Sequence, residues 1–341
     1  MVSLRMFYSR TPKIKDINGK IKPNSVASLE SAQIGGIDQW IIIRGHDKNY
    51  PILLFLHGGP GSIEGPFAYK FQRDLEEHFI VVNWDQRGAG KSYSKKIPKN
   101  SMNIEQFISD AHELIRLLLN RFNQEKLYLV GHSWGSILGT LVVSRYPELI
   151  QAYVGIGQVV NILENEKLSY KYTIDQAKER GDDKALKQLK KLEPYPEKDI
   201  NDTKALRKQR KWLMKFNGVM HNESGWWSHL KIALGSPEYS LKDMIKFIRG
   251  LKLSLKTMWS QLFEIDFPKQ IPELKVPVYI CVGRFDYNTP FELAEKYFNQ
   301  LQAPKKKLIW FENSAHMLNT EESEKFNDFL INVVLQETRN E

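Results

Sequence analysis

The sequence predicts an α/β fold in which helices cover both faces of a mostly parallel central sheet. Short apolar segments alternate with longer segments whose apolar residues recur at helical spacing, and this alternation is typical of parallel sheets. One apolar segment, residues 52–57, is continuous, which indicates a strand buried on both faces. The alternation stops near residue 159 and resumes near residue 273, so we expect a helical domain inserted into the sheet.

The individual elements follow from local patterns. Residues 9–30 contain Pro12, Gly19, Pro23 and many lysines, and they predict an extended lead-in. Short apolar runs predict strands at residues 39–44, 52–57, 79–84, 127–130, 153–156, 278–282 and 308–311. Helices are predicted at residues 104–122, 136–145, 291–301 and 322–335.

These elements divide the chain into a lead-in (residues 1–30), a core (residues 31–158 and 273–341) and a helical lid (residues 159–272). In the lid, residues 174–192 and 203–216 indicate charged helices, and four of the eight tryptophans lie between its ends. We expect the lid to lie over the C-terminal edge of the sheet, where open α/β sheets bind their ligands.

The composition narrows the class of protein. Lys and Arg exceed Asp and Glu by 49 − 40 = 9, but the basic residues are spread thinly, so nucleic-acid binding is not expected. Cys281 is the only cysteine, which excludes an internal disulfide and fits a cytoplasmic protein. No segment reaches the ~20 apolar residues of a membrane helix, so we expect membrane contact only if the natural N-terminus is longer. The oligomeric state is left open.

The strongest chemical signal is the pattern G-x-S-x-G at residues 131–135, between a predicted strand and a predicted helix. A sharp strand-to-helix turn strains the serine backbone and requires small neighbours. It also places the serine oxygen at a helix N-terminus, where backbone N–H groups favour developing negative charge. We therefore expect Ser133 to be a nucleophile; the alternative is a helix N-cap serine after a tight turn.

A second glycine-rich segment, H-G-G-P-G at residues 57–61, follows the apolar strand. Consecutive glycines let backbone amides approach a ligand closely. Such a loop supplies one oxyanion donor, and the residue after the nucleophile supplies the other. We assign the N–H groups of Gly59 and Trp134, with Gly58 as the alternative to Gly59. An ordinary glycine–proline turn is the competing interpretation, and His57 is expected to be structural.

A general base and an orienting acid complete the predicted triad. His316 is the only histidine after the predicted lid, and it follows the strand at residues 308–311. Asp286 follows the strand at residues 278–282, whereas the rival Asp266 lies in the return from the lid. The order Ser133, Asp286, His316 is the one associated with G-x-S-x-G turns. A surface histidine is the alternative for His316.

Metal and cofactor chemistry find little support in the sequence. There is no H-E-x-x-H pattern and no cysteine pair. Residues 88–92, G-A-G-K-S, lack the leading glycine of a phosphate-binding P-loop and indicate a tight turn. We expect neither a metal nor a cofactor.

These motifs together resemble the proline iminopeptidase family of α/β-hydrolases. The resemblance covers H-G-G-P-G, D-Q-R-G-A-G-K-S at residues 85–92, G-H-S-W-G-S at residues 131–136, G-R-F-D at residues 283–286 and S-A-H at residues 314–316. It implies an α/β-hydrolase fold and a metal-free aminopeptidase that removes an N-terminal proline or small residue from a short peptide through an acyl-enzyme.

The family also implies lid carboxylates near tryptophans that bind the substrate's amino group. The candidates here are Glu223 beside Trp226 and Trp227, and Glu164 or Glu166 near the lid entrance. The family's usual lid motif is not recognisable in this stretch. Relatives with similar cores cleave esters, amides or lactones, so a carboxylesterase, amidase or lactonase is the alternative. A ligand receptor built on a hydrolase fold is a more remote one.

Overall fold

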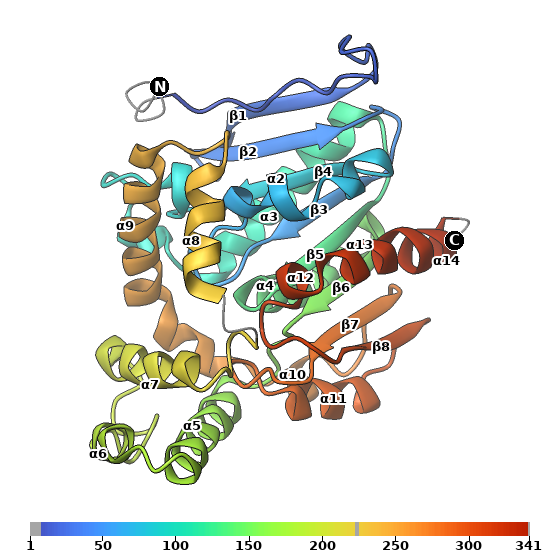
Figure 1. Cartoon of the computed structure of the whole chain (residues 1–341). Helices are drawn as coiled ribbons and strands as arrows, with labels where there is room; N and C mark the ends of the chain where they lie inside the picture. Colours follow the sequence, from blue (N-terminus) through green and yellow to red (C-terminus); the bar gives the residue numbers. More distant parts are fainter. Residues whose placement is uncertain (1–7, 222–224, 340–341) are drawn as a thin grey trace.

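The computed structural model describes residues 8–221 and 225–339, and these form an eight-stranded sheet flanked by helices (Figure 1). The strand order is β1-β2-β4-β3-β5-β6-β7-β8. The β1–β2 and β2–β4 pairs are antiparallel. From β4 to β8 in this order, every pair of neighbouring strands is parallel. The strands are β1 (Val26–Ile34), β2 (Ile37–Gly45), β3 (Ile52–Leu56), β4 (Ile80–Asp85), β5 (Leu127–His132), β6 (Ile150–Ile156), β7 (Val278–Gly283) and β8 (Lys306–Phe311). The predicted mostly parallel α/β fold is confirmed.

The first strand corrects the predicted lead-in. Residues 26–30 do not belong to an extended lead-in, because β1 begins at Val26 and pairs with β2 along its whole length. Only Val26 and Ile34, the two ends of β1, are buried. An edge strand of half-exposed residues lacks the apolar run by which the inner strands are recognised.

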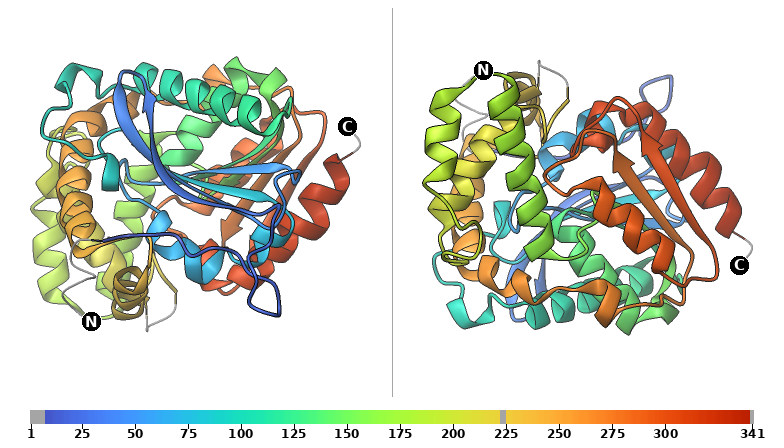
Figure 2. Two further views of the ribbon diagram at one scale, coloured as in Figure 1. Left: turned by 90° about the horizontal axis from the view of Figure 1, so that it is seen from above. Right: turned by 90° about the horizontal axis from the view of Figure 1, so that it is seen from below.

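Two hydrophobic clusters show that both faces of the sheet are covered. Along β3, Leu54 and Leu56 join the cluster with α3 (Ile104–Phe122), α4 (Trp134–Arg145) and α11 (Phe291–Gln300). Leu53 and Phe55 join the other cluster. That cluster includes α13 (Ser323–Phe329) and the π-helical turn Leu330–Leu335, which leads into α14 (Gln336–Thr338). Figure 2 shows these layers from two sides. The alternation follows from the two-residue repeat of a strand.

The long insertion lies between β6 and β7. It contains α5 (Ile162–Glu179), α6 (Asp183–Lys190), α7 (Thr203–Lys215), α8 (Gly225–Gly235), α9 (Leu241–Met258) and α10 (Phe267–Gln270). The helix predicted at residues 174–192 is in fact parts of α5 and α6, which are separated at Gly181. Among the described residues, no helix is long and apolar enough to cross a membrane.

The second half of the insertion is fastened to the core by buried polar contacts. Tyr239 Oη donates to Asp85 Oδ1 at 2.7 Å, and Lys91 Nζ pairs with Asp243 Oδ2 at 2.8 Å. Burial raises the pKa of Asp85 to about 6, although its bonds to Tyr239 and to the Lys91 amide oppose this shift. The D-Q-R-G-A-G-K-S motif therefore anchors the N-terminal end of α9.

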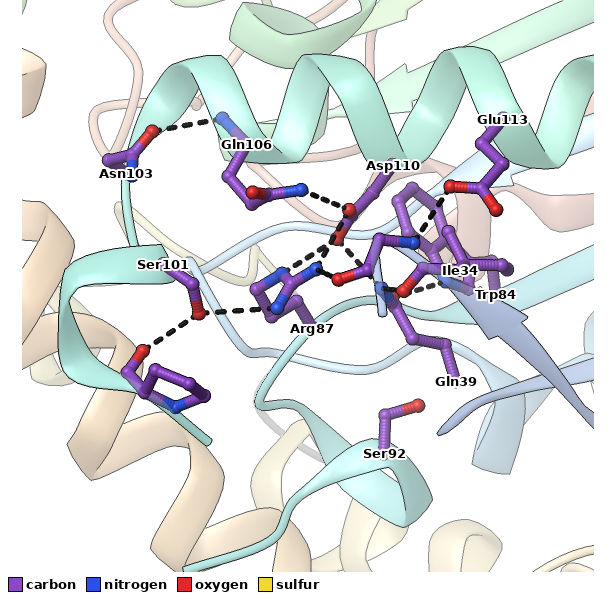
Figure 3. A network of polar contacts seen from close by, with 12 residues as sticks. Ile34, Gln39, Trp84, Arg87, Ser92, Ser101, Asn103, Gln106, Asp110 and Glu113 are labelled. Atoms are coloured by element: carbon purple, nitrogen blue, oxygen red, sulfur yellow. Dashed lines mark hydrogen bonds and ion pairs between the residues drawn. The ribbon is translucent and has the colours of Figure 1, made fainter. Parts of the chain in front are cut away.

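The same motif is fixed to α3 by a buried ion pair, shown in Figure 3. Arg87 Nε and Nη2 donate to the two carboxylate oxygens of Asp110 at 2.8 and 2.9 Å. Arg87 also donates to the Gly35 carbonyl, while Gln39 and Gln106 donate to Asp110. The side chains of Arg87 and Asp110 are 1% and 0% exposed. The pair thus ties the loop after β4 to α3 and to the β1–β2 turn.

Candidate active site

Ser133 occupies the turn between β5 and α4. Its φ of 56° and ψ of −117° lie in a region that non-glycine residues rarely adopt, so the backbone is strained there. The flanking glycines permit this turn: a Cβ on Gly135 would lie 1.9 Å from the Leu56 carbonyl oxygen, and a Cβ on Gly131 would lie 2.4 Å from the Gly135 oxygen. The spacing of the motif therefore has a direct steric cause.

The glycine-rich loop after β3 packs against this turn. A Cβ on Gly58 would lie 3.1 Å from Cβ of Ser133. Gln86 links the two segments that carry the assigned oxyanion donors: its backbone N–H donates to His57 Nε2 at 3.2 Å, and its side-chain oxygen accepts from Trp134 Nε1 at 2.8 Å. Burial lowers the pKa of His57 to about 4, so this ring is neutral and serves as an acceptor. No sequence pattern predicts this role for Gln86.

Asp286 and His316 are brought together from the ends of β7 and β8. His316 Nδ1 lies 2.9 Å from Asp286 Oδ2. The other carboxylate oxygen, Oδ1, accepts from the backbone N–H groups of Asn288 and Thr289, and Oδ2 also accepts from Thr289 Oγ1 at 2.7 Å. These donors fix the orientation of the carboxylate. The rival Asp266 instead pairs with Lys269 at the start of α10.

His132 places the His316 loop beside the serine turn. Its Nε2–H donates to the His316 carbonyl at 3.1 Å, and the two ring centroids are 4.8 Å apart. On the other side, a Cβ on Gly157 would lie 2.8 Å from His316 Cε1. Ser133 directly follows His132. The serine, the histidine and the aspartate therefore lie near one another beyond the C-terminal ends of β5, β7 and β8, the edge where open α/β sheets bind ligands.

A buried carboxyl group that the sequence analysis missed lies beside this cluster. Glu64 is 7% exposed; its Oε1 accepts from Asn319 Nδ2 and lies 3.7 Å from His132 Nδ1. Its Oε2 has no hydrogen-bond partner within the part of the chain that the structure describes. Burial is the largest effect and raises the pKa of Glu64 to about 7.

Glu64→Gln should change how stability depends on pH. The folded state holds the Glu64 proton up to about pH 7, whereas the unfolded chain releases it near pH 4.5, so the free energy of unfolding falls as pH rises between these values. The loss amounts to about 3 kcal/mol. Glutamine does not titrate, so the variant should gain stability relative to the wild type from pH 4.5 to pH 8. Urea unfolding across this range measures the difference.

The control for this experiment is Glu148→Gln, because Glu148 is exposed. Its stability should follow that of the wild type at every pH. Parallel stability curves for Glu64→Gln and the wild type would show that the Glu64 proton is not held by the fold.

The predicted lid residues are not gathered at this cluster. Glu223 lies outside the described residues, as do the side chains of Trp226 and Trp227. Glu164 pairs with Lys167 and lines a cavity of about 560 Å³. Ser133, Asp286 and His316 do not line this cavity. The alternative Glu166 is fully buried within the insertion, where Arg210 and Tyr195 bind its carboxylate.

A different segment of the insertion contacts the loops that follow β7 and β8. The Gly218 carbonyl accepts from the Tyr287 N–H at 3.0 Å, and the Val219 carbonyl accepts from the His316 N–H at 3.1 Å. The His221 ring stacks on Phe285 with centroids 3.8 Å apart. Residues 217–221 thus lie against the loops that carry both Asp286 and His316.

Comparison with known proteins agrees with this geometry. A family model described as the alpha/beta hydrolase fold matches residues 51–323. Probable aminopeptidase YbaC of Bacillus subtilis is 36% identical over 304 residues, which cover 89% of this chain and 94% of that protein. A proline iminopeptidase of Heyndrickxia coagulans is 25% identical, with 80% and 87% of the two chains covered.

Among solved structures, proline iminopeptidase from Mycobacterium smegmatis superposes with a TM-score of 0.66 at 16% identity. The match covers 91% of this chain and 98% of that one, and it supports the fold. The family model and the Bacillus relative each span most of the chain. The chain therefore belongs to the α/β-hydrolase fold family and, within it, is proline iminopeptidase-like.

Proposed function

We propose that the protein is a serine aminopeptidase that releases an N-terminal proline or small residue from short peptides. The observation that carries the proposal is the Asp286–His316 pair held beside a strained serine at a helix N-terminus. The name of the Bacillus relative, an aminopeptidase, and those of the proline iminopeptidases support the substrate class.

In the proposed reaction, Ser133 Oγ attacks the scissile carbonyl while His316 Nε2 accepts its proton. Asp286, bound to Nδ1 of His316, stabilises the imidazolium that forms. The oxyanion is stabilised by two backbone N–H groups, which we assign to Gly59 and Trp134. His316 then protonates the leaving amine, and water, activated by the same histidine, releases the acyl group.

We further propose that the insertion, residues 159–272, acts as a lid over this site. The support is the contact of residues 217–221 with the loops of Asp286 and His316, together with the anchoring of α9 on the motif at residues 85–92. Burial raises the pKa of the Cys281 thiol, which leaves it unreactive. Because Cys281 is the only cysteine of the sequence, no internal disulfide can form, and this supports a cytoplasmic location as part of the proposal.

Four substrates test the proposed function: a proline arylamide, an alanine arylamide, an N-blocked proline arylamide and a short p-nitrophenyl ester. We expect cleavage of the free-amine arylamides and rejection of the blocked one, because an aminopeptidase must recognise a free amino group. Ester turnover without arylamide turnover would make the protein an esterase. Absence of turnover together with absence of fluorophosphonate labelling would favour a receptor.

A further inference from the structure

The helices α8 and α9 of the insertion lie next to each other (Figure 1). Exposed apolar side chains are concentrated on these two helices. Five of the nine large apolar side chains that are exposed in the described residues lie there. They are Leu230 and Leu234 on α8 and Leu241, Ile245 and Ile248 on α9, and Ile248 is 67% exposed. A gathering of this kind marks an interaction surface more often than single exposed residues do.

The charged residues exposed on these helices are all cationic. On α9 they are Lys242, Arg249, Lys252 and Lys256, and on α8 Lys231. The single acidic residue of α9, Asp243, is turned inward to Lys91 and Ser240. Leu241, Ile245, Ile248, Lys252 and Lys256 recur at intervals of three or four residues, so they form one stripe along the helix.

The opposite stripe of α9 is packed on the core next to the site. A Cβ on Gly250 would lie 2.4 Å from the Gly88 carbonyl oxygen, and a Cβ on Gly61 would lie 2.9 Å from Ser254 Oγ. The inner face of α9 thus borders the glycine-rich loop, and its N-terminal end is held by Asp243. The outer stripe is therefore presented on a helix whose position is fixed.

The first described residues lie at the same corner of the molecule. The Arg10 N–H donates to the Pro237 carbonyl at 2.9 Å, and Ser9 Oγ accepts from Lys91 Nζ at 2.7 Å. Pro237 lies in the turn between α8 and α9. Tyr8 is 77% exposed and Arg10 is exposed, so this corner adds an aromatic ring and another cation to the apolar and basic face.

We infer that this surface, the α8–α9 face (Leu230, Leu234, Leu241, Ile245, Ile248, Lys252 and Lys256), docks on a membrane that carries anionic lipids. Exposed leucine and isoleucine enter the boundary between headgroups and acyl chains, and lysines bind the phosphates around them. A protein partner fits less well, because lysine is depleted at protein interfaces and leucine is under-represented among their hot spots. The inference is independent of the proposed peptidase activity.

The test is co-sedimentation of the full chain with vesicles of phosphatidylcholine alone or mixed with phosphatidylglycerol. We expect binding to the mixed vesicles only, weakened at high salt. The double variants Ile245→Ser/Ile248→Ser and Lys252→Glu/Lys256→Glu should each bind at least about tenfold more weakly. The control Ile17→Ser/Ile21→Ser removes two exposed isoleucines at a turn before β1 and should bind like the wild type.

Circular dichroism and thermal melting of each variant show whether its fold is kept. Failure of the wild type to bind the mixed vesicles would overturn the inference, as would an equal loss in the Ile17/Ile21 control. So would a dimer, seen by size-exclusion chromatography, that Ile245→Ser/Ile248→Ser dissociates while vesicle binding stays unchanged. Loss of arylamide cleavage alone bears on the proposed function and leaves this inference intact.

Discussion

Ser133→Ala is expected to reduce arylamide turnover by a factor on the order of 10⁴ to 10⁶, the range found when the nucleophile of a serine hydrolase triad is removed. Alanine retains the backbone and the packing but leaves the proposed base, His316, with no hydroxyl to deprotonate. Covalent labelling by a fluorophosphonate should disappear together with the turnover. Initial rates and labelling on the same preparation measure both effects.

Ser144→Ala provides the matched control for this experiment. Ser144 is an exposed serine on α4, the helix that begins directly after Ser133. Its removal should leave both turnover and labelling at the level of the wild type. Labelling that persists in Ser133→Ala would assign the nucleophile to another residue, and the proposed triad would then be wrong.

Asp110→Ala is expected to destabilise the fold by about 3–5 kcal/mol, because it leaves the Arg87 guanidinium buried without its counter-charge. Both side chains are almost completely excluded from solvent, and Asp110 also accepts hydrogen bonds from Gln39 and Gln106. All of these donors would lose their acceptor together. The midpoint and slope of urea unfolding measure the change.

Glu105→Ala is the control on the same helix, α3. Its carboxylate pairs with Arg145, but the two side chains are 69% and 41% exposed. Exposed pairs of this kind contribute roughly 0–1 kcal/mol, so the variant should unfold close to the wild type. If Asp110→Ala and Glu105→Ala lowered the unfolding free energy equally, burial would not be what makes the Arg87 pair important.

The sequence predicted those parts of the fold in which the buried side chains are apolar. The inner strands β3 and β7 are buried throughout, so each is a short, mostly apolar run in the sequence. The start of α5 was missed because its buried side chains include Asn165, Glu166 and Thr173. A helix that buries polar groups against other polar groups has no apolar periodicity to detect.

The residues of the candidate site also divide into those that the sequence predicts and those that it does not. Ser133, Asp286 and His316 each follow a strand by at most five residues, within a short local motif that can be recognised in one sequence. Glu64 is different, because its partner Asn319 lies 255 residues further along the chain. The role of Thr289 could have been predicted from the sequence, because a threonine three residues after an aspartate can donate a hydrogen bond back to its carboxylate.

If the insertion acts as the proposed lid, the two backbone hydrogen bonds that the Tyr287 and His316 amides donate to it would couple access to the proposed site with the readiness of that site for catalysis. To let residues 217–221 swing away, the molecule must release the amide of His316 and that of Tyr287, the neighbour of Asp286. In the proposed mechanism, an open molecule would thus hold His316, the proposed base, and the Asp286 loop less firmly. It would admit a substrate before Ser133 could be activated, and the reaction would wait for the insertion to return.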